Sequence, residues 1–271
     1  MVRLTIEGSD PNASPCAIVA KGIVYDCGGL GLKPVGGMFG MKGDMGGAAS
    51  LAGACLTLAK MNVKPKSTMH FIFCIAENAI GPNAMRNDDI ILQKSGKTVE
   101  VNHTDAEGRI VMGDGVAYAT FDLGVKTIWN IATLTGAGRR DNGNYHGCLV
   151  TNDEELEKMI FKAGLYTGDM VHPLIYAPEC HFHQYNSIVA DFQNSVAVQD
   201  NATTSCGAYF VGAHMKGQFD FDGKWAHLDY SGCATFKELG KQRSTGYLCA
   251  LIVASFAKLA GYQTNFDFTD F

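Results

Sequence analysis

The segment VNHTDAEGR, which begins at Val101, places charged groups at every second position: Asp105, Glu107 and Arg109. It overlaps the end of the β-like run KTVEV. If the chain stays extended there, alternate residues point to one side, and these three groups converge. A second interpretation also fits, because Thr104 and Glu107 have the spacing of a helix capping box. That alternative places the acids at a helix N-terminus, which favours anions.

Two further carboxylates stand beside glycine-rich turns. Asp26 ends the apolar run AIVAKGIVYD, and Asp44 precedes the small-residue run GGAASLAGACLTLAKMN. Each has an ordinary structural explanation, since Asp26 can close an Asx turn and Asp44 can cap the following helix. Lys21 is harder to explain in that way, because a lysine inside an apolar strand must be paired, neutral or bound to metal.

Four carboxylates at one site repel one another, and each raises the pKa of the others unless cations are present. Divalent metal ions are the usual cations in such sites, and two ions suit four carboxylates. An oxygen-rich ligand set favours zinc, manganese or magnesium over a thiolate site. The residue types therefore predict a centre with two metal ions.

Apolar β-like runs alternate with longer helical patterns along the chain. Strands are predicted at 17–26, 68–77, 125–134 and 224–230, and helices at 46–62, 153–166 and 244–261. This order, with nearly continuous apolar strands, predicts an α/β fold whose mixed, largely parallel central sheet is covered by helices on both faces. In such sheets functional groups gather beyond the strand ends, where the acidic residues lie.

The composition narrows the class of protein. At 271 residues the chain can form one large domain or two small ones. Its net charge of -5, without a block rich in Lys or Arg, does not predict a nucleic-acid partner. No run reaches the ~18 apolar residues of a membrane span, so no membrane partner is predicted. The N-terminus lacks a signal-peptide core, and nine cysteines form no CxxC pair, so we expect a cytoplasmic protein with reduced, buried thiols.

Several segments carry a resemblance to one known family. The blocks are KGIVYDCGGLGLKP, GMKGDMGGAA, TVEVNHTDAEGRIVMGDGVAYA and ATLTGA, followed by VADFQNS, KWAHLDYSG and STGY. Together they resemble the leucine aminopeptidase (cytosol aminopeptidase) family from about Cys16 to Gly261, and the TDAEGR block is highly specific. The segments GDMVHPLIYAPE and NSVAVQDNATTSC are similar to the aminopeptidase-like branch of that family. The resemblance implies a zinc-peptidase-like catalytic domain.

The resemblance also implies a role for each charged residue of the predicted metal centre. Lys21, Asp26, Asp44 and Glu107 would hold the tighter of two Zn²⁺, Mn²⁺ or Mg²⁺ ions. Asp26, Asp105 and Glu107 would hold the exchangeable ion, so Asp26 and Glu107 would bridge. A lysine bound to metal must be neutral, far from its free pKa of ~10.4.

The remaining site residues follow from the resemblance in the same way. Lys33 would stay protonated and stabilise the developing oxyanion. Arg109 would hold a bicarbonate that helps to shuttle the proton. The residues expected to bind substrate are Met41, Thr133, Leu134 and Gly136.

These implications define the expected function. The chain would be a dimetal aminopeptidase that releases N-terminal amino acids from short peptides, and the family pattern implies a homohexamer. Residues 1–271 would form a single catalytic domain that lacks the family's N-terminal domain and the start of its catalytic domain. The alternative is a catalytically inactive member that acts as a binding or regulatory protein.

Five residues depart from the family pattern. His103 stands where the family usually has Asn, and Gly43 replaces a larger residue before Asp44. Ser231 stands where Ala is frequent. The sequence after TLTGA contains Arg139 and Arg140 in place of an apolar continuation, which predicts an altered specificity pocket.

Overall fold

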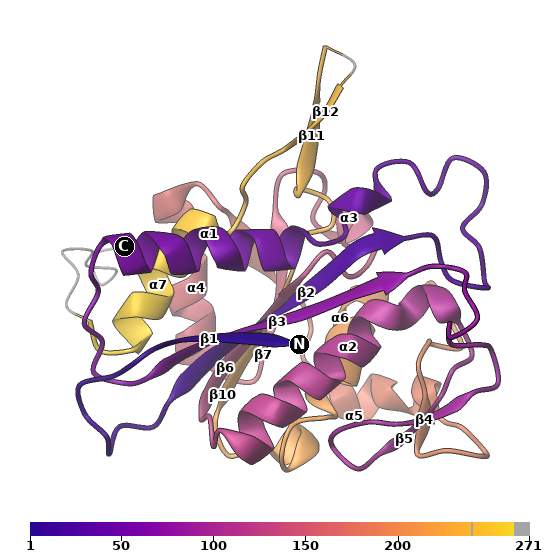
Figure 1. Ribbon diagram of the computed structural model, residues 1–271, viewed down its shortest axis with the longest axis horizontal. Coiled ribbons are helices and arrows are strands. Elements are labelled where there is room, and N and C mark those ends of the chain that lie inside the picture. Colours follow the sequence, from indigo (N-terminus) through magenta and orange to yellow (C-terminus); the bar gives the residue numbers. More distant parts are fainter. Residues whose placement is uncertain (240, 263–271) are drawn as a thin grey trace.

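A seven-stranded sheet runs through the middle of the protein (Figure 1). The computed structural model describes residues 1–239 and 241–262. In spatial order the strands are β1 (Val2–Ile6), β3 (Met69–Asn78), β2 (Cys16–Asp26), β6 (Thr127–Ala132), β10 (Lys224–Asp229), β7 (Gly147–Thr151) and β8 (Val171–Pro173). The central strands β3, β2, β6 and β10 are parallel, as are β7 and β8, whereas β1 and β7 run antiparallel to β3 and β10. The prediction of a mixed, largely parallel sheet is confirmed.

Helices cover both faces of this sheet. On one face lie α1 (Gly46–Lys60), α4 (Glu154–Thr167) and α7 (Cys249–Leu259), and on the other lie α2 (Glu107–Ala117) and α6 (Thr203–Gly212). Two short α-helices are α3 (Gly138–Asp141) and α5 (Pro178–His181). The 3-10 turns are η1 (Met41–Gly43), η2 (Thr104–Ala106), η4 (Phe182–Tyr185) and η5 (Gln218–Asp220). A π turn, η3, spans Tyr118–Asp122. The predicted helices at 46–62, 153–166 and 244–261 correspond to α1, α4 and α7.

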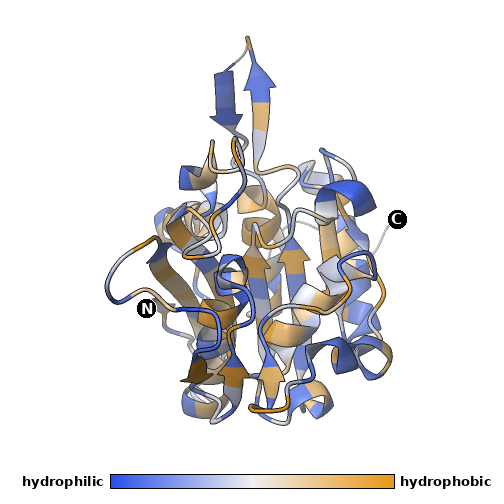
Figure 2. Ribbon diagram, turned by 90° about the vertical axis from the view of Figure 1, so that its right-hand side faces the viewer, coloured by the Kyte–Doolittle hydropathy of each residue, from blue (hydrophilic) through white to orange (hydrophobic). Residues whose placement is uncertain are grey.

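Strand β2 shows why the sheet is buried on both sides. Ile18 and Ala20 pack into the apolar core beneath α1 and α7, whereas Ala17 and Val19 pack into the core beneath α2 and α6. This alternation explains a continuous apolar run, because both faces of the strand are covered. Lys21 follows in the same alternation and lies on the α2 side, in the middle of the strand. The strands in the middle of the molecule are largely hydrophobic and are coloured orange (Figure 2).

Two smaller sheets complete the fold. One contains β4 (Ile90–Leu92), β5 (Thr98–Glu100) and β9 (Phe192–Gln193), and the other is the hairpin of β11 (Thr235–Glu238) and β12 (Lys241–Ser244). The hairpin projects from the body of the molecule (Figures 1 and 2). All nine cysteines are free, and every one except Cys180 and Cys249 is buried. None of the helices in the described ranges is both long and apolar enough to cross a membrane.

Candidate active site

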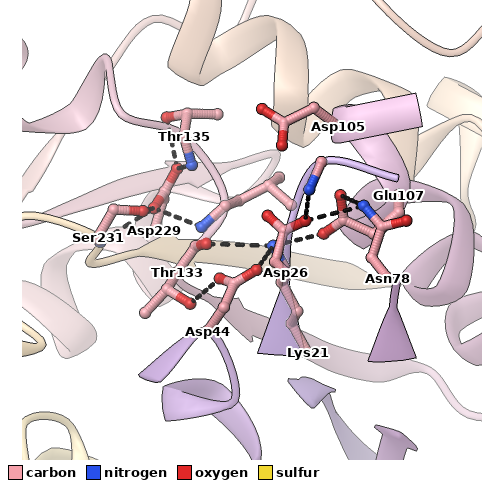
Figure 3. Close-up of polar contacts among 12 residues, drawn as sticks. Lys21, Asp26, Asp44, Asn78, Asp105, Glu107, Thr133, Thr135, Asp229 and Ser231 are labelled. Atoms are coloured by element: carbon pink, nitrogen blue, oxygen red, sulfur yellow. Dashed lines mark hydrogen bonds and ion pairs between the residues drawn. The ribbon is translucent and has the colours of Figure 1, made fainter. Parts of the chain in front are cut away.

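Charged residues from three separate segments meet at one edge of the sheet (Figure 3). Lys21 comes from the middle of β2 and Asp26 from its end, Asp44 from the turn before α1, and Asp105 and Glu107 from η2 and the start of α2. We call these five residues the acidic cluster. Except for Asp105, all are buried. The fold therefore brings together every metal ligand that the family resemblance implies, although 86 residues separate Lys21 from Glu107 in sequence.

Lys21 lies between two carboxylates. Its Nζ is 2.7 Å from Asp44 Oδ2 and 3.1 Å from Glu107 Oε1. Burial alone would lower the pKa of Lys21, but the charges of Glu107 and Asp44 outweigh it and raise that pKa. Burial raises the pKa values of Asp44 and Glu107, and Lys21 opposes both shifts. In this arrangement Lys21 is the protonated partner of both acids, so binding a metal ion through Nζ would require the cation to displace that proton.

Gly108 makes room for this lysine. A Cβ atom at position 108 would stand 2.5 Å from Lys21 Cε and 2.7 Å from its Nζ. The glycine therefore lets the first turn of α2 approach the Lys21 side chain closely. Gly108, the glycine of TDAEGR, therefore has a packing role at the site.

Lys33 forms ion pairs with the other two acids of the cluster, Asp26 and Asp105. Its Nζ is 2.7 Å from Asp26 Oδ2 and 2.6 Å from Asp105 Oδ1. Burial opposes the charged form, but the bonds to Asp105 and Asp26 raise the pKa of Lys33. Asp26 Oδ1 also accepts from the backbone N–H of Gly28 at 2.9 Å. The Asx turn proposed as a structural explanation of Asp26 is therefore present, and it fixes one oxygen while the other faces the site.

Asn78 is a site residue that the sequence interpretation missed. Its Nδ2 donates to Asp26 Oδ1 at 2.8 Å and lies 3.1 Å from Glu107 Oε2 and 3.0 Å from Thr104 O. Asn78 therefore holds two acids of the cluster in place from the end of β3. No local spacing in the sequence marks Asn78, because its partners lie 26 to 52 positions away.

The TDAEGR segment is helical, so of the two alternatives the chain adopts the helix N-terminus and not the extended form. It forms η2 and the start of α2 because polar groups hold the turn at its beginning. His103 Nδ1 accepts from Asp105 N at 3.4 Å, so His103 caps η2. Thr104 does not form the predicted capping box, because its hydroxyl donates to Gly28 O at 2.6 Å. The helical turn still places Asp105 and Glu107 on one site.

Arg109 points away from the acids. Its Nη1 is 3.0 Å from both Tyr185 Oη and Asn194 O, and its buried Nε has no hydrogen-bond partner among the described residues. Arg109 and Tyr185 are both buried, and the Tyr185 hydroxyl donates to Cys206 O at 2.8 Å. The arginine side chain therefore lies in a closely packed part of the protein. Arg109 is therefore not the neutralising partner of Asp105 or Glu107. Its free Nε–H makes it a suitable holder of a small anion.

A cavity of about 350 Å³ opens over the acidic cluster. Four of its lining residues are those expected to bind substrate: Met41, Thr133, Leu134 and Gly136. Thr133 Oγ1 donates to Asp44 Oδ1 at 2.7 Å, so Asp44 does not cap α1 as the structural alternative proposed. Gly43 also lines the cavity, and a Cβ there would meet nothing within 4 Å. The glycine at this position therefore leaves open space above η1.

Asp229 is the second residue that the sequence interpretation missed. It is 1% exposed at the end of β10. Its carboxylate accepts from the backbone N–H groups of Leu134 and Thr135 at 3.1 and 2.9 Å, and from the Ser231 hydroxyl at 2.9 Å (Figure 3). Asp229 thereby fixes the loop after β6. The run KWAHLDY held this signal, since an acid at the end of an apolar strand must find donors.

The acidic cluster fits divalent metal ions by the number and closeness of its carboxylates. Asp26, Asp105 and Glu107 can each offer an oxygen such that all three lie within 4.8 Å of one another. The buried atoms Asp44 Oδ2, Asp105 Oδ1 and Glu107 Oε1 accept no hydrogen bond within the described ranges, and lysine ammonium groups form ion pairs with all three. Lys21 and Lys33 supply two positive charges against the four carboxylates of the cluster, so the site still attracts further cations. Oxygen donors in this number suit Zn²⁺, Mn²⁺ or Mg²⁺.

The sequence and the fold both match proteins that are already known. A model of the cytosol aminopeptidase family, catalytic domain, matches residues 1–253. Probable aminopeptidase NPEPL1 of Mus musculus is 50% identical over 242 residues, or 89% of this chain and 45% of that protein. Leucine aminopeptidase 1 of Caenorhabditis elegans is 44% identical over 250 residues, or 92% of this chain and 48% of that protein.

The apo structure of leucyl aminopeptidase from Trypanosoma cruzi superposes with a TM-score of 0.87 at 44% identity, covering 95% of this chain and 49% of the other. The chain spans about half the length of the curated relatives it matches.

Proposed function

The chain belongs to the cytosol aminopeptidase family, and we propose that it is a dimetal aminopeptidase that releases N-terminal amino acids from short peptides. One observation carries the proposal: the oxygens of Asp26, Asp105 and Glu107 lie within 4.8 Å of one another beside a cavity of about 350 Å³. A cavity of that volume accepts an amino-acid side chain and part of a peptide. The carboxylates beside it attract the free α-amine, which is positively charged in a peptide.

The roles proposed for the cluster are those that the family resemblance implies, and the meeting of its residues at one site supports them. Lys21, Asp26, Asp44 and Glu107 would hold one metal ion, and Asp26, Asp105 and Glu107 would hold the other. When bound, such ions polarise a peptide carbonyl and make water a stronger nucleophile. Asn78 orients Asp26 and Glu107, and supporting hydrogen bonds of this kind would determine both the affinity for a metal ion and the orientation of its ligands.

The other residues bind and orient the peptide. Lys33 keeps its proton and presents a positive charge next to Asp26 and Asp105, where it can stabilise negative charge that develops on the carbonyl oxygen. Leu134 and Gly136 present backbone groups on a loop that Asp229 holds rigid. Arg109, with its unpartnered Nε–H, would hold a small anion such as bicarbonate near the reaction.

Location and assembly are part of the proposal. We place the protein in the cytoplasm, because its relatives include proteins named cytosol aminopeptidase and its cysteines are free. We also propose a homo-oligomer, a hexamer by family pattern.

Hydrolysis of a leucyl peptide tests the proposed activity. The 271-residue chain loaded with Mn²⁺ or Zn²⁺ should release leucine, and a chelator should stop the reaction. Asp26→Ala should abolish hydrolysis, whereas Asp200→Ala, which removes an exposed acid outside the cavity, should leave it intact. A metal-loaded chain that binds a peptide but hydrolyses none would favour the alternative of a non-catalytic member. That alternative is not favoured, because the complete set of implied metal ligands and Lys33 are present together.

A further inference from the structure

One side of the cavity is polar and carries a cation. Arg139, Ser231, Thr235 and Gln242 are among its lining residues, and we call these four residues the polar wall. Thr235 Oγ1 accepts from Gln242 Nε2 at 2.9 Å, and Ser231 Oγ donates to Asp229. Two of the five departures from the family pattern, Arg139 and Ser231, therefore meet on this single wall.

Contacts near the start of its side chain hold Arg139 in place. Its Nε donates to Asn144 Oδ1 at 3.1 Å. A Cβ atom at Gly232 would stand 3.0 Å from Arg139 Cγ, so the absence of a side chain at 232 lets the arginine stem lie there. Within the described ranges, no carboxylate pairs with Arg139, and neither of its Nη groups has a protein acceptor. Up to four N–H donors of the guanidinium remain for a ligand.

The other two cations of the cavity are already neutralised. Lys21 contacts Asp44 and Glu107, and Lys33 contacts Asp26 and Asp105. Arg139 differs from both, because no carboxylate among the described residues pairs with its charge. A ligand that brings an amine to the acidic cluster and a carboxylate to Arg139 would complement both sides of the cavity. A guanidinium binds a carboxylate through two parallel hydrogen bonds, which adds direction to the attraction.

We propose that Arg139 is a specificity-determining residue that selects peptides with a carboxylate close to the N-terminal amine. This inference rests on the proposed aminopeptidase function and names its substrate class. The carboxylate can come from two sources. It is either the side chain of an N-terminal Asp or Glu, or the terminal carboxylate of a dipeptide.

Matched substrate pairs separate the two sources. Glu-Gly-amide and Gln-Gly-amide differ only in the side-chain charge, and Leu-Gly and Leu-Gly-amide differ only in the terminal charge. The 271-residue chain loaded with Mn²⁺ should show a kcat/KM at least about tenfold higher for the charged member of one pair. Arg139→Gln should bring that ratio close to one, and Arg139→Lys should retain part of it. The pair that responds identifies the source of the carboxylate.

Arg140 provides the matched control. It is exposed, lies next to Arg139 in sequence and does not line the cavity. Arg140→Gln changes the net charge by the same amount as Arg139→Gln. The ratio should stay at the wild-type value in Arg140→Gln. Equal ratios in wild type and Arg139→Gln, or equal losses in both glutamine variants, would overturn the proposal. A role of Arg139 in folding alone would lower the rates for both members of a pair and leave their ratio unchanged.

Binding separates this inference from the proposed function. If the wild-type chain hydrolyses no peptide, the aminopeptidase proposal fails. Titration calorimetry of the same four compounds into the metal-loaded chain then measures the selectivity without turnover. A tighter Kd for the charged member in wild type, lost in Arg139→Gln, supports carboxylate recognition, and equal Kd values within both pairs contradict it.

Discussion

The two sides of the cavity differ in burial, in the elements that carry them and in their match to the family pattern. The acidic cluster stands on β2 and the start of α2, where Lys21 and Glu107 are each 4% exposed. The polar wall stands on α3, the turn after β10 and the β11–β12 hairpin, and its Arg139 and Gln242 are exposed. Regular elements fix the first side, whereas short turns and a projecting hairpin carry the second (Figure 1).

We infer from this difference that the acidic cluster determines the type of reaction and that the polar wall determines the choice of substrate. The buried side needs every charge balanced, because an unpaired charge away from water is costly. The exposed side tolerates changes of residue, and Arg139 and Ser231 depart from the family pattern there. If the division is right, changes to the acidic cluster reduce activity or stability, and changes to the polar wall alter selectivity.

The largest effect is expected from Glu107. Its oxygens face both Lys21 and Asn78, and it would bridge the two metal ions. Glu107→Gln should lower kcat/KM for a leucyl peptide by about a thousandfold or more. Glu77→Gln is the matched control, because Glu77 is exposed on β3 next to Asn78. A Glu107→Gln enzyme within tenfold of wild type would mean that this acid has no central role.

The next effect concerns stability and Lys21. In the presence of a chelator, Lys21→Met should lower the free energy of unfolding by about 3–5 kcal/mol, because it leaves buried Asp44 and Glu107 without a cation. Urea denaturation measures this loss. Lys126→Met breaks an exposed ion pair with Asp222 and should change the free energy within experimental error. Equal losses in the two variants would show that the buried pairing does not stabilise the fold.

A smaller effect is expected on metal affinity. Asn78→Ala removes the amide that holds Asp26 and Glu107, and the metal Kd should rise by about 10–100-fold. Titration calorimetry with Mn²⁺ gives this value directly. Asn12→Ala, at an exposed position of the loop before β2, serves as the control. An unchanged Kd in Asn78→Ala would assign the residue to folding alone.

The smallest effect distinguishes two glycines of the site. Gly108→Ala places a methyl group 2.5 Å from Lys21 Cε, whereas Gly43→Ala points into open space. Gly108→Ala should lower the free energy of unfolding by about 1 kcal/mol, since the far end of the lysine can shift. Gly43→Ala should leave it unchanged in the same thermal or urea denaturation. A larger loss in Gly43→Ala than in Gly108→Ala would contradict the described packing.

The parts that could be predicted from sequence are those that a repeating pattern encodes. The apolar runs of β2, β3, β6 and β10 gave strands at nearly the observed bounds, because a strand covered on both faces has apolar residues throughout. Lys21 was conspicuous for the same reason, as a charge inside such a run. The acids were recognisable because several carboxylates beside strand ends need a cation.

The parts that could not be predicted depend on single hydrogen bonds between distant segments. Asn78 contacts Asp26 and Glu107, 52 and 29 positions away, and Asp229 contacts the backbone of Leu134, 95 positions away. No spacing rule reveals such partners. The helical start of TDAEGR depends on His103 and Thr104, whose partners are a backbone amide and a loop carbonyl. Arg109 was placed with the acids by alternation in an extended chain, and the helix turns it toward Tyr185 instead.

Metal stoichiometry tests the account most directly. Equilibrium dialysis of the 271-residue chain against Zn²⁺ or Mn²⁺, followed by elemental analysis, counts the ions bound per chain. The account predicts about two ions per wild-type chain, because two overlapping ligand sets share Asp26 and Glu107, and a loss of both ions in the double variant Asp26→Ala/Glu107→Ala. A wild-type chain that binds no divalent ion at saturating concentration, or a double variant that binds as many as wild type, would contradict it.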